Sequence, residues 1–287
     1  MNTIVILILI IIVVVHCNYN KISTFGQSEN NKGYNIEENF KTNETTSGNK
    51  IALILHVGNY NVFEEIVNKY PRFFNNKSID LYFTCNSKII YEMLSKNYPN
   101  AKLFLCENRG MDIGPFLTVL KYFIDINVHY NYYIKIHTKT DAKWRNEMID
   151  PIYNRLSYFL NTKQNTIAFY GSKKWIMNGN FLINYKYVAD IIDRNFSELK
   201  NKFLEYCTTN VTGMCKHEPP YFVAGTVFVF NDKYFDLLKN IKNLDFERNI
   251  METGYSHNDV NNPRKTHAWE YLFGYLNALT GNKITEL

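Results

Sequence analysis

Cysteine is scarce in this chain, and its scarcity excludes one class of small secreted protein. Five cysteines among 287 residues are too few for a disulfide scaffold. Cys85 and Cys106 lie in apolar, strand-like runs, whereas Cys207 and Cys215 bracket a short polar loop. If the protein folds in an oxidising compartment, a bridge between Cys207 and Cys215 is the one disulfide that we expect.

An excess of one charge sign is also missing. The chain carries 32 basic and 27 acidic residues, for a net charge of +5, and it has no long basic block. Because proteins that follow a phosphate backbone concentrate Lys and Arg in one patch or segment, nucleic acid is not an expected partner. A modestly basic cleft that attracts a nucleotide diphosphate is compatible with this balance.

Several common catalytic signatures are absent from the sequence. It contains no G-x-S-x-G elbow, no G-x-x-x-x-G-K-[ST] loop, no H-E-x-x-H helix and no paired C-x-x-C. The chemistries that these motifs carry therefore have no residue set to which they can be assigned. With 46% hydrophobic and 16% aromatic residues, the chain can still bury a large core, which indicates one sizeable globular domain.

The N-terminus opens with an apolar run, residues 4–15, that is shorter than the roughly 20 apolar residues of a membrane-spanning helix. Its length is typical of a signal-peptide core, and Val15 and Cys17 are small enough to precede a cleavage site. A charged n-region is missing apart from the amino terminus. An uncleaved type II signal anchor and a buried core element are the alternatives, and we expect a signal peptide or signal anchor at residues 1–17.

Residues 18–49 are rich in Asn, Ser, Thr, Gly and charge and contain few apolar residues. Such a segment cannot bury enough surface to offset its ordering entropy, so it predicts a flexible polar stem. Leader and stem together predict a body in the secretory pathway (ER or Golgi lumen) or secreted, held at the membrane if the leader stays uncleaved. Sequons at Asn43, Asn76, Asn195 and Asn210 agree with that location.

The remaining residues, 50–287, alternate between strand-like and helix-like patterns. Apolar runs predict strands at 51–58, 79–85, 101–107, 130–137, 165–172 and 220–231. Helical patterns lie at 60–70, 87–98, 114–125, 184–207 and 266–279. This alternation predicts a single α/β domain with a mostly parallel sheet flanked by helices, whose ligands bind beyond the carboxyl ends of the strands.

Five motifs follow one another along this body: a His at the first strand end, then NRGMDIGPFL, YIKIHTKTDAKWR, FVAGTVFVFN and HAWEYLFG. Their order resembles the rhamnan synthesis protein F family over about residues 50–279, with the leader and stem outside. The resemblance implies a GT-A-like, Rossmann-like glycosyltransferase domain associated with polysaccharide assembly. It also implies a nucleotide-sugar donor, carrying rhamnose or another deoxyhexose, and a glycan acceptor.

The chain is similar, more distantly, to GT-A nucleotide-sugar transferases, in which an Asn-x-Gly turn precedes a strand that ends in a D-x-D metal motif. Asn108, Arg109 and Gly110 match the turn, but the strand ends in HTKTD, with Asp141 as its single carboxylate. The resemblance implies Mn²⁺ or Mg²⁺ at Asp141 and His137. The departure from D-x-D leaves metal-independent transfer as the alternative.

Transfer of a sugar requires that the charge developing on the leaving diphosphate be stabilised. Lys139 can neutralise the departing phosphate while His137, Thr138 or Asp141 orients it, or else Lys139 and Asp141 are solvated loop charges. His56, after a buried strand, lies where a GT-A-like domain begins its nucleotide pocket, with a structural histidine as the alternative.

The turn NRGMDIGPFL combines flexible glycines with a helix start. Gly110 and Gly114 allow backbone geometry that other residues resist, and Pro115 suits the first helical turn. Asp112 falls at or near the helix N-cap, which explains it structurally. An N-cap at a strand's carboxyl end faces the ligand edge, so Asp112 and Arg109 are also candidates to contact sugar hydroxyls and phosphate.

Two further residues, Arg145 and Gly225, have two interpretations each. Arg145 either pairs with Asp150 or reaches the diphosphate, and Trp144 beside it is expected to pack. Gly225, inside a predicted strand, indicates either close approach of an acceptor or tight packing.

The last helix carries the candidate base. His267 and Glu270 are three residues apart and hence on one helical face. Late acidic residues of GT-A-like enzymes deprotonate the acceptor, so the resemblance implies Glu270 as the base, with His267 as neighbour or substitute. An ordinary helix carboxylate is the alternative for Glu270, and Trp269 is either a core residue or an acceptor-stacking one.

These patterns lead to one functional hypothesis and one rival. The hypothesis is a glycosyltransferase in polysaccharide or glycoprotein glycan synthesis. The rival is a non-catalytic glycan-binding protein on a degenerate glycosyltransferase fold, which the missing D-x-D favours.

Overall fold

A computed structural model describes residues 51–178, 181–207, 221–255 and 262–287. The leader expected at 1–17, the stem expected at 18–49, the disulfide expected between Cys207 and Cys215, and the sequons at Asn43 and Asn210 lie outside what is described. Among the described helices, none combines the length and the apolar character needed to cross a membrane.

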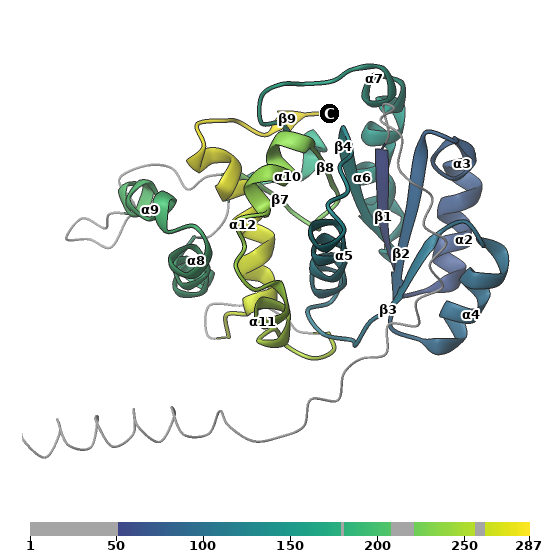
Figure 1. The fold of residues 1–287 in the computed structure, drawn as a ribbon, viewed down its shortest axis with the longest axis horizontal. Coiled ribbons are helices and arrows are strands. Elements are labelled where there is room, and N and C mark those ends of the chain that lie inside the picture. The colour runs from purple at the N-terminus through teal and green to yellow at the C-terminus, as the bar shows by residue number, and fades with distance from the viewer. Residues whose placement is uncertain (1–50, 179–180, 208–220, 256–261) are drawn as a thin grey trace, which may run out of the picture. The chain divides into compact units, whose positions relative to one another are not determined.

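A seven-stranded sheet forms the centre of the domain, in the order β3-β2-β1-β4-β8-β5-β9 (Figure 1). Its strands are β1 (Ile51–Val57), β2 (Ile79–Cys85), β3 (Lys102–Leu105), β4 (Tyr132–His137), β5 (Phe169–Gly171), β8 (Phe228–Asn231) and β9 (Thr285–Glu286). The first four strands of the order are parallel, β8 is antiparallel to both of its neighbours, and β9 is parallel to β5. The mixed α/β fold with a mostly parallel sheet is consistent with the predicted Rossmann-like class.

Helices connect and cover the strands. They are α2 (Tyr60–Lys69), α3 (Pro71–Asn75), α4 (Lys88–Asn97), α5 (Ile113–Asp125), α6 (Ala142–Asn154), α7 (Leu156–Asn161), α8 (Phe181–Asn195), α9 (Lys200–Cys207), α10 (Asp232–Leu238), α11 (Leu244–Asn249) and α12 (Lys265–Leu279), with 3-10 turns at Lys173–Trp175 and Ser197–Leu199. Short polar residues begin several of them: the side chains of Asn59, Ser87 and Asn231 each accept a backbone N–H in the first helical turn.

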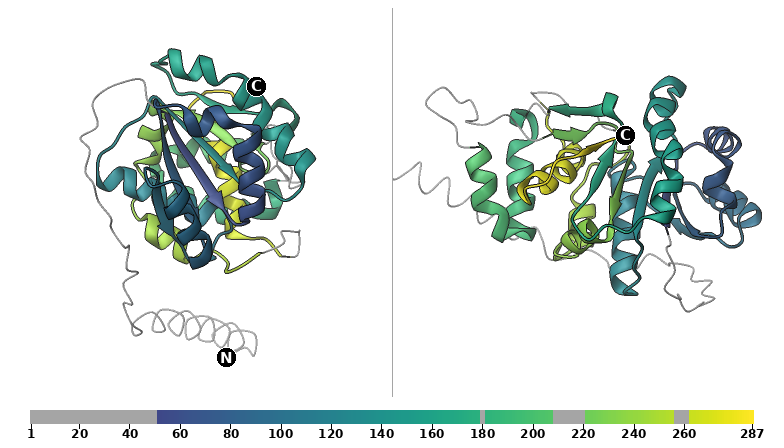
Figure 2. Two further views of the ribbon diagram at one scale, coloured as in Figure 1. Left: turned by 90° about the vertical axis from the view of Figure 1, so that its right-hand side faces the viewer. Right: turned by 90° about the horizontal axis from the view of Figure 1, so that it is seen from above.

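The two faces of the sheet bury separate apolar clusters. Along β1, Ile51, Leu53 and Leu55 point to the face covered by α2, α3 and α6, whereas Ala52 and Ile54 point to the face covered by α5 and α12 (Figures 1 and 2). This alternation follows from the two-residue period of a strand. His56 continues the second series, so its side chain lies on the α5 face.

Three expectations from the sequence need correction. The run 220–231 is not one strand: β7 (Tyr221–Val223) pairs with β6 (Ile176–Asn178) in a separate two-stranded sheet, and β8 joins the central sheet in reverse. The helix expected at 184–207 is divided into α8 and α9. The sequon at Asn195 is buried, and its amide donates to Glu247 and to Ile191 O, so the folded protein cannot present it for glycosylation.

Candidate functional site

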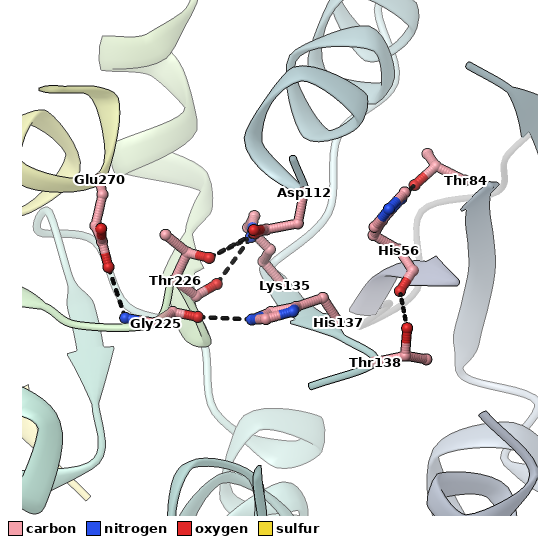
Figure 3. A network of polar contacts seen from close by, with 9 residues as sticks. All are labelled: His56, Thr84, Asp112, Lys135, His137, Thr138, Gly225, Thr226 and Glu270. Carbon is pink, nitrogen blue, oxygen red and sulfur yellow. Dashed lines mark hydrogen bonds and ion pairs between the residues drawn. The ribbon is translucent and has the colours of Figure 1, made fainter. Parts of the chain in front are cut away.

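A lysine lies in the core near the carboxyl ends of the parallel strands. Lys135 of β4 is 1% exposed and points to the α5 face. Its Nζ forms an ion pair with Asp112 and donates to the carbonyl O and the Oγ1 of Thr226 at 2.9 and 3.0 Å (Figure 3). These acceptors offset the cost of burying an ammonium group. Lys135 was not predicted as a site residue, although a single lysine inside the mostly apolar run YYIKIH was the available signal.

Asp112 stands at the start of α5, as expected, but it does not cap the helix. Its carboxylate accepts no N–H from the first turn and instead receives Lys135 Nζ and Thr226 Oγ1. Burial, the largest single effect, raises the pKa of Asp112. The charges of Lys135 and His137 and the hydrogen bonds from Lys135 and Thr226 together outweigh it and hold the pKa well below its usual range. The carboxylate is therefore committed to a buried ion pair rather than presented to a sugar.

The Asn108–Gly110 turn is fastened to the chain that precedes α12. Gly110 has φ +70°, as its expected role requires, and its N–H donates to Glu252 O at 2.8 Å. Asn108 O accepts from Gly254 N at 2.7 Å. The Glu252 carboxylate in turn accepts from the backbone N–H groups of Lys265 and Thr266, so the turn is tied to the start of the helix that carries Glu270.

Arg109 serves this attachment and does not reach into the site. Its guanidinium pairs with Glu107 at 3.0 Å and donates to the carbonyl oxygens of Asn249 and Met251 at 3.2 and 2.9 Å. These N–H donors of Arg109 are thus engaged by the protein itself, and the contact of Arg109 with a donor phosphate stays a prediction.

Gly225 and Thr226 form the turn where the candidate residues meet. Gly225 has φ +80° and Thr226 has φ +53°, an uncommon conformation for a β-branched residue. Gly225 N–H donates to Glu270 Oε1 at 2.6 Å, and Gly225 O accepts from His137 Nε2 at 2.8 Å (Figure 3). Because β8 is reversed, the residues that precede it lie at the same edge as the end of β4.

Glu270 is half-buried on α12. Burial, only partly opposed by the hydrogen bond from Gly225, raises its pKa to about 7. No described residue donates a hydrogen bond to its second oxygen, Oε2. A carboxyl group that titrates near neutral pH is suited to take a proton from a hydroxyl. His267 lies one turn earlier on α12, and the contacts described at Gly225 involve Glu270 and His137 rather than His267.

Two histidines and a threonine join the ends of β1 and β4. Burial lowers the pKa of His56 to about 4 and also lowers the pKa of His137, so both rings are neutral near pH 7. His56 Nδ1 is 3.0 Å from Thr84 Oγ1, and because a carbonyl can only accept, His137 carries its proton on Nε2. Thr138 Oγ1 accepts from the N–H groups of Gly58 and Asn59.

The side chain of Lys139, two residues after His137, lies over a pair of stacked aromatic rings. Its Nζ lies 3.6 Å from the centroid of the Trp144 ring, and Trp144 stacks on Trp175 with centroids 4.7 Å apart. Burial lowers the pKa of Lys139, while the charges of Asp112, Glu270 and Asp141 oppose that shift. Lys139 and Glu270 are thus close enough for each charge to affect the other.

Arg145 and Asp141 shape the loop that holds Lys139. Arg145 is buried, pairs with Glu65 rather than Asp150, and donates to Lys139 O at 2.6 Å. Asp141 Oδ1 caps α6 by accepting from Trp144 N at 2.8 Å. Neither alternative weighed for Arg145 describes this contact, and its guanidinium supports the loop instead of extending toward a diphosphate.

The acceptor contact expected for Trp269 is not supported by its position. Trp269 is 0% exposed and packs beside Phe273 in the core, so its ring has no face open to a sugar. Beside the site, the side chains of Ile54, His56, Thr84, Asp112, Phe116, Lys135 and Ile136 leave no space between them that would admit even a water molecule. These residues therefore do not themselves enclose a pocket for a nucleotide sugar, because ligand pockets measure roughly 300 Å³ or more.

Replacing Gly225 by alanine should destabilise the protein more than the same change at another positive-φ glycine. A Cβ at Gly225 would lie 2.9 Å from Met148 Sδ and 3.2 Å from Trp144 Cζ2, whereas Gly281, at φ +82°, has nothing within 4 Å. Both variants incur a left-handed backbone penalty of about 1 to 2 kcal/mol. Overpacking adds about 1 to 3 kcal/mol for Gly225→Ala only, measurable by urea unfolding. Equal losses would contradict the tight contact described here.

The fold and site together define a mixed α/β, Rossmann-like domain with charged groups gathered at the carboxyl edge of its parallel strands. The family model of rhamnan synthesis protein F matches residues 10–281, and the chain belongs to this family. The match begins inside the apolar run at 4–15, so it includes most of the segment that the motif resemblance left outside. Membership connects the chain with rhamnan synthesis and a glycosyltransferase-like role. Comparison with curated proteins gave no match.

Proposed function

We propose that this protein is a GT-A-like glycosyltransferase that moves a sugar from a nucleotide-diphosphate donor to a glycan acceptor. The observation that carries the proposal is Glu270, a half-buried carboxyl group with a pKa of about 7, held by Gly225 and lying near Lys139 at the ligand edge of the sheet. Family membership supports the reaction class. The family's name favours rhamnose or another deoxyhexose as the transferred sugar.

In the proposed reaction, Glu270 takes the proton of an acceptor hydroxyl as that oxygen forms a bond to the anomeric carbon of the donor sugar. The bond between the anomeric carbon and the diphosphate oxygen breaks, and its electron pair leaves with the nucleotide diphosphate. The ammonium of Lys139 stabilises the charge that develops on this leaving group. His56, His137 and Thr138 are the remaining candidates for donor contacts at the strand ends.

A divalent metal does not fit the residues around HTKTD well. Mg²⁺ and Mn²⁺ prefer several oxygen ligands, whereas here one oxygen of Asp141 caps α6, His137 Nε2 donates to Gly225 O, and an ammonium group lies between them in sequence. Among the described residues, the side chains gathered closely enough to share an ion are His129, Asp232 and Asp236, which belong to other elements. The proposed reaction therefore includes no step through a metal.

The test is a thermal-shift series on the purified full-length chain with nucleotide diphosphates and nucleotide sugars, each with Mn²⁺, Mg²⁺ or chelator. A ligand that binds only the native state increases the free energy of unfolding by about RT ln(1 + [L]/Kd) and therefore raises the melting temperature. A shift produced by one ligand and not by the others identifies the donor. The chelator arm shows whether a metal takes part. A folded protein that shows no shift at millimolar ligand would contradict the proposal.

The rate of transfer should rise with pH through about 7. The base must be deprotonated to act, and the pKa of Glu270 is raised from 4.5 to about 7. The stability effect has the opposite sign: a raised carboxyl pKa stabilises the fold below pH 4.5, and this contribution is lost as pH rises through about 7. A pH profile of kcat alongside thermal melts would separate the two effects, and an acidic limb near pH 4.5 would contradict the assignment.

A glycan-binding protein without catalysis is the second candidate. It is favoured by the internal pairing of Asp112, Arg109 and Arg145, which leaves these side chains committed to the protein. We propose, from the leader and the stem alone, that the protein is located in the lumen of the secretory pathway or is secreted. In the thermal-shift series, stabilisation by glycans together with indifference to every nucleotide would favour this second candidate.

A further inference from the structure

The buried pair of Asp112 and Lys135 has no role in the proposed reaction, although it lies beside it. Lys135 donates to both oxygens of Thr226, at 2.9 and 3.0 Å, and Asp112 accepts from the Thr226 hydroxyl. The pair therefore holds one residue by its side chain and by its backbone. That residue, Thr226, has a positive φ, which a β-branched residue adopts only when its surroundings impose it.

The neighbouring residue connects this arrangement to the candidate base. Gly225 uses its N–H for Glu270 and its carbonyl for His137, so its peptide groups have fixed directions on both sides. A rotation of the Gly225–Thr226 peptide would displace the carbonyl from His137, and a rotation of the preceding peptide would displace the N–H from Glu270. The orientation of both catalytic-site side chains thus depends on a turn that the buried pair fixes (Figure 3).

We propose that Lys135 and Asp112 are positioning residues that act through the Gly225–Thr226 turn to orient the carboxylate of Glu270 and set its affinity for a proton. The inference rests on the proposed role of Glu270 as the base, but it concerns a physical property of the free protein.

An alternative role, stabilisation of the fold alone, is weakly supported by a buried ion pair. Replacing such a pair by apolar residues of similar size is often neutral or stabilising, because desolvation offsets the attraction. The charged groups that act on Glu270 are Asp112, whose charge raises its pKa, and Lys135 and Lys139, whose charges lower it. Since the first two oppose each other, removing both leaves mainly the effect of the turn.

The experiment measures the titration of Glu270 without substrate. The infrared absorption of carboxylate groups is followed against pH, and the spectrum of the same protein carrying Glu270→Gln is subtracted, so that the difference reports Glu270 alone. The variants are the full-length Lys135→Met/Asp112→Leu protein and the full-length Thr226→Val protein, which loses the hydroxyl, with Thr226→Ser as the control that keeps it. Arg194→Met/Glu247→Gln is the control for an ion pair elsewhere, because the partly exposed Arg194 binds the buried Glu247 through two hydrogen bonds that do not involve the turn.

The titration midpoint of Glu270 should rise by about one pH unit in the double variant, since a hydrogen bond to a carboxylate is lost or weakened. It should rise by a smaller amount in Thr226→Val and stay unchanged in both controls. If the double variant does not fold, the comparison of Thr226→Val with Thr226→Ser decides. Wild-type midpoints in the folded variants would overturn the positioning role even if transfer is found, and a shifted midpoint would support it even if no donor is found.

Discussion

Glu270→Gln should reduce sugar transfer by about 10²-fold or more, and up to about 10⁴-fold, while the protein stays folded. The amide oxygen of Gln can still accept the Gly225 N–H, so the geometry of the turn is kept. The amide cannot take a proton from the acceptor hydroxyl. The loss should appear in kcat with a small change in the acceptor KM, because the base acts in the transition state.

The stability of this variant separates catalysis from folding. At pH 8 the Glu270 carboxylate carries a charge that burial disfavours, so the neutral Gln should melt at the same temperature as the wild type or higher. Glu92→Gln, on the exposed surface of α4, is the matched control and should change neither rate nor melting temperature. Full turnover by purified Glu270→Gln would remove Glu270 as the base.

Lys139→Ala should reduce transfer by about 10²-fold or more, the scale observed when one preorganised charge stabiliser is lost. The ammonium lies over the Trp144 ring, which limits its freedom and holds it near the charges of Glu270 and Asp112. Single-turnover measurements at saturating donor would place the defect in the chemical step. Donor binding measured by thermal shift should weaken less than kcat falls.

A control for charge alone is available four residues later. Lys143, on the exposed side of α6, can be changed to Ala with the same loss of net charge, and transfer should be unaffected. Lys139→Arg keeps a cation and should recover part of the rate. If Lys139→Ala and Lys143→Ala changed the rate of transfer equally, Lys139 would be an ordinary solvated loop charge, which is the alternative that the sequence left open.

The first four strands of the central sheet could be predicted because parallel strands buried on both faces read as continuous apolar runs. The reversal of β8 could not, since a two-residue period is the same in either direction. The run 220–231 concealed a turn at Gly225 and Thr226, because the residues on both sides of this turn are apolar. A strand of the two-stranded sheet ends before the turn, and a strand of the central sheet begins after it. Gly225 was the visible mark of that turn, and it was interpreted as either close approach of an acceptor or tight packing.

The sequence placed His56, Asp112 and His137 at the carboxyl ends of parallel strands, where the structure has them, but the partners of the charged residues were not predicted. Arg109 binds the carbonyl of Met251, 142 residues away, and no local pattern encodes that distance. Lys135 was treated as part of a strand because its neighbours are apolar. The physical signal was present, since a lysine inside a buried strand requires an anion, and that anion is Asp112, to which the sequence assigned a role at the helix N-cap.

The contacts of the Gly225–Thr226 turn also bear on the order in which this protein can become active during synthesis. Thr226 is separated from Lys135 by 91 residues and from Asp112 by 114, and Gly225 is separated from Glu270 by 45. Contacts so distant in sequence form slowly, because loop closure precedes any gain from them. A ribosome-bound chain that ends before α12 would contain the aspartate–lysine pair and the turn but no base. Activity should therefore appear only after the last helix has emerged and docked.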